Sequence, residues 1–425
     1  MLLQFNFKNF KSFRDETTLD LTAASITENP EHLVEIGQEK ILPTAAILGA
    51  NASGKSNVLE AFRFMCTYVR ESFAYGGESS ERARKGPGRR RTPFVFDRNG
   101  KNEPSTFEVY FIAAEGTGDR VRFYHYGFAL DDDGVAEEWL NEKTRKAKEY
   151  RPVFYRNRAD GTLDLEKIPV RGQENLRDAL EDETLVVSLG AKLKISKLKA
   201  VRDWFLHVDF TDFGNPIENA LLSSLLPEDF VDNKKVQDDV VKYFATFDPS
   251  IIGLRVRKLQ RDPKDDRPSA HVEIDAIHRM ADTEETATIP LEEESEGTLK
   301  MFALYPMMQY ARKNGGVFCV DELNSKLHPL LVRNILIAFL NSDLNPKHAQ
   351  LIFTTHDAWQ LSNHLLRRDE IWFTEKDVNG VSTLFSLADF LDEDGTGIRK
   401  DESYEKNYLL GKYGAIPTLT GFGFA

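Results

Sequence analysis

Hydrophobic and polar residues alternate in several parts of the first half of the chain, and this period of two predicts β-strands. Residues 1–13 carry apolar side chains at every second position, and a second short strand is expected at 17–21. Three more runs of this kind, 107–112, 121–130 and 135–140, are separated by short turn segments. We therefore expect an antiparallel meander in this region.

Between residues 176 and 247 the apolar residues recur every three or four positions, which predicts helices. The residues that share a helical face are Ile195, Leu198, Val201, Trp204 and Phe205 in one segment and Val236, Val240, Tyr243 and Phe244 in another. Segments 251–259 and 271–277 are then predicted to be strands joined by the charged loop 260–268. Residues 143–158 are basic and poorly periodic, so no regular element is expected there.

A strand, a glycine-rich turn and a helix follow one another early in the chain. The apolar run 41–48 predicts the strand, and the helical spacing of apolar residues from Asn57 onwards predicts the helix. Between them, residues 49–56 match the pattern G-x-x-x-x-G-K-[ST], whose backbone N–H groups and helix N-terminus hold phosphate groups. The expected nucleotide-binding residues are Gly49, Asn51, Ala52, Ser53, Gly54, Lys55, Ser56 and Asn57.

Within this loop, two side chains have distinct expected roles. Lys55 supplies a compact positive charge for the β- and γ-phosphate oxygens of ATP, and Ser56 supplies a hydroxyl for Mg²⁺.

A second apolar strand, 317–322, ends on two carboxylates. A P-loop enzyme needs an acid at such a strand end to hold Mg²⁺, and a second carboxylate can orient the attacking water. We expect Asp321 to be the metal ligand and Glu322 the catalytic base. A further apolar strand, 350–354, precedes His356, which we expect to contact the γ-phosphate and to sense its loss.

Upstream of these strands, residues Ser295 to Thr298 begin a helical stretch. Ser295, Gly297 and Thr298 at a helix start can either cap the helix or bind an anion through the same N–H geometry as the P-loop. Pro306 is expected to kink or end this helix.

Composition and charge leave this picture unchanged. The chain has 425 residues, 41% of them hydrophobic and 29% charged, as in ordinary soluble globular proteins. Its formal net charge of −13 limits any nucleic-acid contact to a local patch, for which the basic loop Arg82–Arg91 is the candidate; a solvated loop is the alternative. Cys66 and Cys319 are expected to be buried and without chemistry. We find no apolar run of membrane-spanning length and no signal-peptide pattern, which favours the cytoplasm.

The order of the motifs adds a resemblance to a known family. Loop 49–56, the Ser-x-Gly helix start, the strand that ends on Asp321 and Glu322, the segment 324–328 and the strand before His356 together resemble the ABC-type ATPase head. The resemblance implies an α/β fold: a P-loop head with a mixed sheet, an antiparallel β-meander subdomain and a helical insertion. The implied domains are an ATPase lobe at 1–175, the helical insertion at 176–250 and the rest of the ATPase lobe at 251–425.

Within that superfamily, residues 7–13 and 49–57 look like the SMC, RecF and OLD branch. Segments 367–373 and 410–417 resemble OLD-like bacterial ATPases of the RloA and AbiLi type, a group associated with anti-phage defence and abortive infection. OLD nucleases carry a Toprim domain after the ATPase, and the chain beyond His356 is expected to be too short for one. A Q-loop residue is not identified, and 94–97 is the expected place for it.

The resemblance also implies how the protein works. Two heads would sandwich ATP and Mg²⁺ in a homodimer or higher oligomer, with Ser295 and Gly297 of one copy reaching the γ-phosphate held by the other and Asn324–His328 as the D-loop. We expect an ATPase that controls a separately encoded effector protein, such as a nuclease, in anti-phage defence. The alternatives are a nucleotide-gated scaffold with little hydrolysis and a RecF-like DNA-repair ATPase that binds nucleic acid through the loop Arg82–Arg91.

Overall fold

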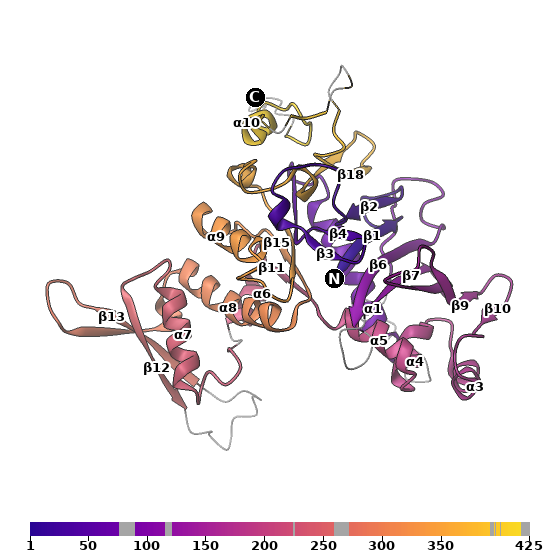
Figure 1. Cartoon of the computed structure of the whole chain (residues 1–425), viewed down its shortest axis with the longest axis horizontal. Helices are drawn as coiled ribbons and strands as arrows, with labels where there is room; N and C mark the ends of the chain where they lie inside the picture. Colours follow the sequence, from indigo (N-terminus) through magenta and orange to yellow (C-terminus); the bar gives the residue numbers. More distant parts are fainter. Residues whose placement is uncertain are drawn as a thin grey trace, which may run out of the picture.

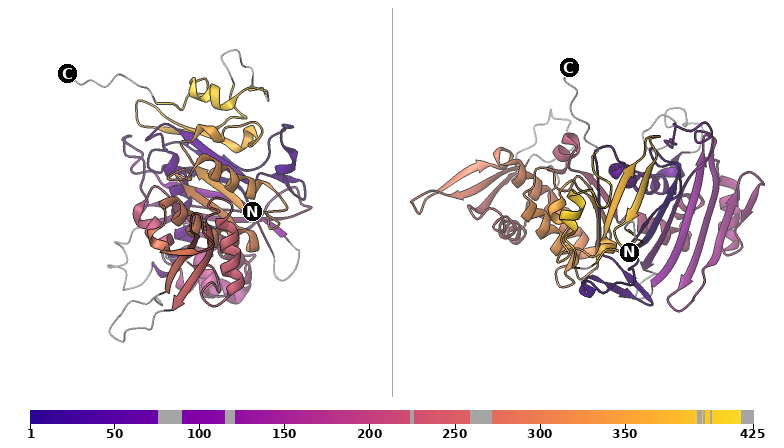
Figure 2. Two further views of the ribbon diagram at one scale, coloured as in Figure 1. Left: turned by 90° about the vertical axis from the view of Figure 1, so that its left-hand side faces the viewer. Right: turned by 90° about the horizontal axis from the view of Figure 1, so that it is seen from above.

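The protein has two large β-sheets with helices between and around them, and a separate arm (Figure 1). The computed structural model describes residues 1–75, 90–114, 121–223, 226–258, 272–391, 395, 397–399 and 401–417. The arm carries β12 and β13 and projects from one side of the body in Figures 1 and 2. In the described part of the chain, every helix is too short or too polar to cross a membrane.

The central sheet has six strands and contains the strands of the predicted nucleotide site. Its order is β11 (Val208–Asp212), β15 (Val317–Asp321), β16 (Gln350–Thr354), β5 (Thr44–Gly49), β17 (Ile371–Lys376) and β18 (Ser382–Ser386). The first five strands are parallel, and β18 is antiparallel to β17. The predicted mixed sheet is therefore confirmed, and the parallel strands place their carboxyl ends at one edge, where α/β proteins bind ligands.

The second sheet is antiparallel and has seven strands. In spatial order they are β10 (Thr162–Asp164), β9 (Arg151–Asn157), β8 (Gly134–Thr144), β7 (Val121–Asp131), β6 (Ser105–Ala114), β1 (Leu2–Lys8) and β2 (Thr17–Asp20). The predicted meander is confirmed by β6, β7 and β8. Our expectation of an irregular segment at 143–158 is wrong, because β9 pairs with β8 there. The buried Val153 and Phe154 of this strand join the core despite its basic flanks.

Helix α1 (Lys55–Glu71) follows the P-loop and packs between the two sheets. Its buried side chains join those of the meander and of the central strands in one core, which includes Phe62, Phe107 and Ile47. The opposite face of the central sheet is covered by α8 (Glu296–Asn314), α9 (Pro329–Leu340) and the segment around α10 (Tyr404–Leu409). Both faces of the parallel strands are thus buried, which explains their continuous apolar sequences. A small hairpin, β3 (Val34–Ile36) and β4 (Glu39–Ile41), lies before β5.

The helices expected between 176 and 247 are present, and a strand interrupts them. They are α3 (Val170–Ala179), α4 (Val186–Lys192), α5 (Ser196–Phe205), α6 (Pro216–Ser223) and α7 (Lys234–Phe244). The interruption is β11, which pairs in parallel with β15 at the edge of the central sheet. The sequence did not predict this strand. Its alternation of apolar and polar residues covers only 208–211, which is too short a run to stand out from the helical pattern around it.

The arm is a three-stranded antiparallel sheet with one helix against it. Its strands are β12 (Ile251–Lys258), β13 (Val272–Arg279) and β14 (Thr286–Pro290), and α7 packs on them. The core of the arm includes Phe302 and Tyr305 of α8, so the arm is built directly onto that helix. The loop expected at 260–268 lies outside the described residues.

Helix α8 continues through Pro306 to Asn314, so of the two expected effects, a kink or an end of the helix, the proline does not end it. A proline inside a helix removes one backbone hydrogen bond and costs about 3 kcal/mol. Here the residues that precede it are well packed, since Phe302, Leu304 and Tyr305 are each at most 6% exposed. Tertiary packing of this kind offsets the local cost of the proline.

Candidate functional site

Strand β5 ends in a tight loop whose glycines cannot be replaced without collision. A Cβ atom on Gly49 would lie 2.4 Å from the carbonyl oxygen of Thr374, and one on Gly54 would lie 2.7 Å from Oγ of Ser382. Both glycines have positive φ, 153° and 116°, a region that L side chains rarely adopt. The loop backbone is therefore pressed against β17 and β18, which leaves it shaped as a concave turn at the start of α1.

Polar side chains under the loop fix its shape. Oγ of Ser53 lies 2.5 Å from Oγ1 of Thr374, and Oγ of Ser382 lies 2.7 Å from the carbonyl oxygen of Ser53. Nδ2 of Asn57 donates to Oγ of Ser12 at 2.7 Å. The side chains of Ser53 and Asn57 thus point into the supporting structure. Any contact that these two residues make with a nucleotide would come from their backbone N–H groups.

Lys55 lies across the mouth of the loop. Its Nζ donates to the carbonyl oxygens of Gly49 and Ala50, at 3.1 Å each, and the residue is 5% exposed. Burial lowers the pKa of Lys55, whereas the negative charges of Glu322 and Asp321 act to raise it. The ammonium group therefore sits between the loop and the acidic end of β15, where it can face an anion held by the loop.

A single hydroxyl group forms hydrogen bonds with both Asp321 and Glu322. Oγ1 of Thr354, on the neighbouring strand β16, donates to the Asp321 carboxylate and accepts from the backbone N–H of Glu322 at 2.8 Å. Glu322 has a left-handed backbone conformation, with φ of 53°. Such a conformation costs a non-glycine residue roughly 1–3 kcal/mol, and it turns the Glu322 side chain away from the direction of the strand.

The Glu322 carboxylate meets His356. Its Oε1 lies 3.1 Å from Nε2 of His356, and this hydrogen bond lowers the pKa of Glu322 below its usual range. Asn324 also anchors the histidine loop, because its Oδ1 accepts from Oγ1 of Thr355 at 2.8 Å and from the His356 N–H at 3.3 Å. The predicted base and the predicted γ-phosphate sensor are therefore in direct contact.

The residues at the start of α8 form a helix cap. Oγ of Ser295 accepts from the backbone N–H of Thr298 at 3.1 Å, and a Cβ atom on Gly297 would meet only Lys326 and Ser295 within 4 Å. Among the described residues, no hydrogen bond or ion pair joins Ser295, Gly297 or Thr298 to the loop 49–56. The structure of one chain therefore brings the P-loop and the acidic strand end together and leaves this motif apart from them.

Lys300, which no sequence pattern singled out, ties α8 to the segment 324–328. Its Nζ donates to the carbonyl oxygens of Ser325, at 2.8 Å, and Phe213, at 3.0 Å, and it lies over the Phe213 ring. Burial lowers the pKa of Lys300 to about 8. The signal in the sequence is a charged residue inside the apolar run Leu299 to Tyr305.

The supporting hydroxyls of Thr354, Thr374 and Ser382 were missed as well, because isolated Ser and Thr residues in strands carry no recognisable spacing.

Of the basic loop Arg82–Arg91, the structure describes only Arg90 and Arg91. Residues 76–89 lie outside the described residues, and with them most of the predicted nucleic-acid patch. Arg91 turns toward the protein: its guanidinium pairs with Asp132 at 2.9 Å and donates to the carbonyl oxygens of Lys101 and Glu103. This arginine is thus engaged by the turn between β7 and β8.

The candidate Mg²⁺ ligands are Ser56 and Asp321. Both residues offer oxygen atoms, which are the ligands that Mg²⁺ prefers. The negative charge of Asp321 acts to raise the pKa of Lys55, so the loop and the acid lie in one electrostatic environment. The glycine-lined turn, the buried ammonium group and the oxygen donors fit a nucleoside triphosphate with its metal ion. Among the residues that the structure describes, no group of three or more His, Cys, Asp and Glu side chains is arranged to hold a metal ion by itself.

Comparison with solved structures and curated proteins gives limited similarity. The crystal structure of an SmcHead bound to the C-winged helix domain of ScpA is 15% identical in sequence, with a TM-score of 0.41; the match covers 91% of this chain and 97% of that one. No curated protein matches the chain.

A family profile gives a firmer result. Residues 45–358, which run from β5 beyond His356, match the family described as "AAA domain, putative AbiEii toxin, Type IV TA system". The match includes the P-loop, the start of α8, the acidic strand end and the histidine, and it extends over more than half of the chain. The chain therefore belongs to this family of P-loop ATPases.

Proposed function

We propose that the protein binds ATP with Mg²⁺ between two copies of the chain and hydrolyses it. The observation that carries the proposal is the meeting of Lys55, Asp321, Glu322 and His356 at the carboxyl edge of the parallel strands. Lys55 comes from the loop after β5, Asp321 and Glu322 from the end of β15, and His356 from the loop after β16, and a hydrogen bond or charge links each to its neighbours. The family match supports the same class of chemistry.

The roles of the residues follow from their contacts. The N–H groups of the loop 49–57 and Lys55 would hold the phosphates, and Ser56 and Asp321 would hold Mg²⁺, which neutralises charge on the β- and γ-phosphates when bound. Glu322 would orient and deprotonate the attacking water. Its lowered pKa keeps it ionised at neutral pH, so it can accept a hydrogen bond from that water. His356 would report the γ-phosphate through its contact with Glu322.

A second copy would complete the site. Among the described residues, Ser295, Gly297 and Thr298 make no hydrogen bond or ion pair with the P-loop of their own chain. They lie at the N-terminus of a helix of 19 residues, which attracts anions. Lys300 and the Lys326–Glu296 ion pair, at 2.7 Å, hold this helix start against the D-loop segment. Two such surfaces facing each other would enclose two nucleotides, as the resemblance to ABC-type heads implies.

We further propose that the ATPase controls a separately encoded effector in anti-phage defence. Support comes from the resemblance of residues 367–373 and 410–417 to OLD-like defence ATPases and from the family description, which names a toxin of a toxin–antitoxin system. A plating assay tests this part: Lys55→Ala should abolish protection from phage in cells that carry the complete locus. Undiminished protection would contradict it.

The biochemical core is tested by nucleotide-dependent assembly. Wild-type protein and Glu322→Gln are passed over a size-exclusion column with light scattering, with and without ATP and Mg²⁺, and phosphate release is measured in parallel. We expect the variant to form a stable dimer with ATP and to release little phosphate. Dimer formation with negligible turnover in the wild type would instead support the nucleotide-gated scaffold, and hydrolysis by Glu322→Gln at the wild-type rate would refute the assignment of the base.

A further inference from the structure

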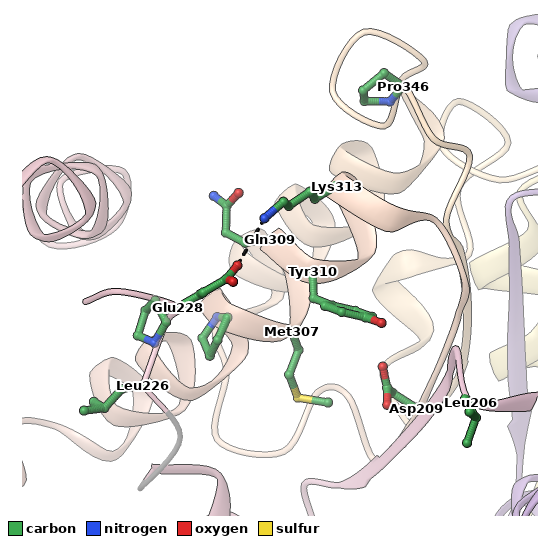
Figure 3. Close-up of a pocket in the computed structure, with 11 residues that line it drawn as sticks. Leu206, Asp209, Leu226, Glu228, Met307, Gln309, Tyr310, Lys313 and Pro346 are labelled. Carbon is green, nitrogen blue, oxygen red and sulfur yellow. Dashed lines mark hydrogen bonds and ion pairs between the residues drawn. The ribbon is translucent and has the colours of Figure 1, made fainter. Parts of the chain in front are cut away.

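A cavity of about 690 Å³ opens between β11, the second half of α8 and the segment before α7, shown in Figure 3. Most of its lining is apolar, and three prolines contribute to it. The lining residues are Leu206, Asp209, Leu226, Pro227, Glu228, Pro306, Met307, Gln309, Tyr310, Lys313 and Pro346. Cavities of this size commonly hold small organic ligands that are oriented by a few polar groups.

The charge in this cavity is unbalanced. Lys313 pairs with Glu228 at 3.1 Å, and Figure 3 places this pair on one side of Met307 and Tyr310, with Asp209 on the other. No hydrogen bond or ion pair engages the Asp209 carboxylate in the described part of the chain. One negative charge is therefore left over in the lining.

The surroundings of Asp209 make that charge costly. Burial raises the pKa of Asp209, although the positive charge of Arg70 partly offsets the effect. Arg70 itself is committed elsewhere, since its guanidinium donates to the carbonyl oxygens of Phe205 and Val208. A half-buried carboxylate without a partner gains from a cation that can reach it.

The side chains beside Asp209 suit the uncharged part of a ligand that carries a cation. Tyr310 is 43% exposed, and its ring is held in place by its hydroxyl, 3.0 Å from Nδ1 of His207. An aromatic ring attracts a cation over its face and packs against an apolar or aromatic body. Met307 next to it adapts to varied shapes.

We propose that this cavity binds a small organic cation, an ammonium or guanidinium group on an apolar body, with Asp209 as the partner of the charge and Met307 and Tyr310 as the wall against the body. The cavity opens toward the end of β11 that is opposite the nucleotide edge of the sheet. Asp209 is near the beginning of β11, whereas Asp212 at its end pairs in register with Asp321. A bound cation would therefore not compete with nucleotide.

The test uses three probes that share one body and differ in charge: 2-phenylethylamine, 2-phenylethanol and phenylacetate. Binding to the full chain is measured by saturation-transfer NMR and titration calorimetry. We expect the amine to bind about tenfold or more tightly than the alcohol, as for a hydrogen bond to a charged group, and phenylacetate to bind more weakly than either. Equal binding of the three probes would overturn the proposal.

Three variants locate the probe. Asp209→Asn, which has the same shape, should reduce the affinity for the amine to that for the alcohol, and Met307→Trp should block both. Glu228→Gln is the matched control, because it removes an acid from the rim, and it should retain the preference for the amine. Thermal melting confirms that each variant is folded. Retention of the preference in Asp209→Asn, or displacement of the amine by ADP, would refute the site.

Discussion

His356 holds Glu322 through a hydrogen bond in which Nε2 of the histidine lies 3.1 Å from Oε1 of the glutamate. The contact joins the loops that follow two adjacent parallel strands, β15 and β16, and it is the main reason why the pKa of Glu322 is lowered. Because the folded pKa lies below the unfolded one, the contribution to stability is present above the ordinary carboxylate pKa. It is lost as the pH falls through the lowered value.

Replacing Glu322 with Gln should remove the base and leave nucleotide binding intact. General-base catalysis contributes roughly 10²–10⁴-fold to a rate, so we expect phosphate release to fall by about that factor. Affinity for a fluorescent ATP analogue should change little, because Lys55 and the loop remain in place. Glu71→Gln, an exposed glutamate at the end of α1, is the matched control and should behave as the wild type does. A loss of nucleotide affinity equal to the loss of rate would contradict this role.

Replacing His356 with Asn should move the pH dependence of hydrolysis. Without the imidazole the pKa of Glu322 rises toward its ordinary value, so the acid limb of the kcat profile should shift to higher pH. The measurement is the initial rate at saturating ATP across the acidic range. His364→Asn, an exposed histidine in the same region, should leave the limb where it is. An unshifted limb in His356→Asn would show that the hydrogen bond does not set the protonation state of Glu322.

Replacing Gly49 with Ala should disrupt the phosphate loop. The new Cβ atom would lie 2.4 Å from a backbone carbonyl oxygen of β17, which cannot move without breaking the sheet. Gly161→Ala is the matched control, because Gly161 also has positive φ, 71°, but has nothing within 4 Å of its Cβ position. Each variant should lose about 1 kcal/mol of stability from backbone strain.

Only Gly49→Ala should also lose ATP affinity, by at least about tenfold, since about 1.4 kcal/mol lost from the phosphate contacts is enough for that factor. Titration of both variants with the fluorescent analogue separates the two effects. Equal affinities for ATP in the two variants would show that the close approach to β17 does not shape the loop.

The sequence was informative where spacing carries chemistry or periodicity. The P-loop pattern located a turn in which Gly49 lies against the backbone of β17 and Gly54 against side chains, and the alternation of residues 107–140 located three strands of the meander. The patterns in the sequence did not predict β11 and β14. One is a five-residue edge strand with two acids, and the other has five exposed residues, so in both the alternating run is too short and too weakly apolar to be recognised.

The directions in which side chains point could not be predicted from the sequence either. Ser53 and Asn57 fall inside or beside the P-loop pattern, and the structure turns both side chains toward Thr374 and Ser12. A pattern records which residue types are present, whereas the partners of a hydroxyl or amide come from strands that are distant in the chain. The contact between Lys300 and the D-loop could not be predicted for the same reason, because 25 residues separate its two ends.

Lys300 should contribute a pH dependence of stability that has a definite sign. Its pKa is about 8 in the folded protein and 10.5 ordinarily, so the unfolded chain binds more protons between these values. The free energy of unfolding should therefore rise through the titration of this group as the pH increases from about 8 toward 10.5.

In Lys300→Met this rise should be absent, and the two unpaired carbonyl oxygens of Ser325 and Phe213 should cost about 1–3 kcal/mol at neutral pH. Urea unfolding of both proteins at a series of pH values gives the difference, in which the titration of all other groups cancels. Lys199→Met, which removes an exposed lysine paired with Asp203, serves as the control and should retain the rise. If the two curves for wild type and Lys300→Met stay parallel above pH 8, the ammonium of Lys300 is not buried as described, and its role in holding α8 to the D-loop fails with it.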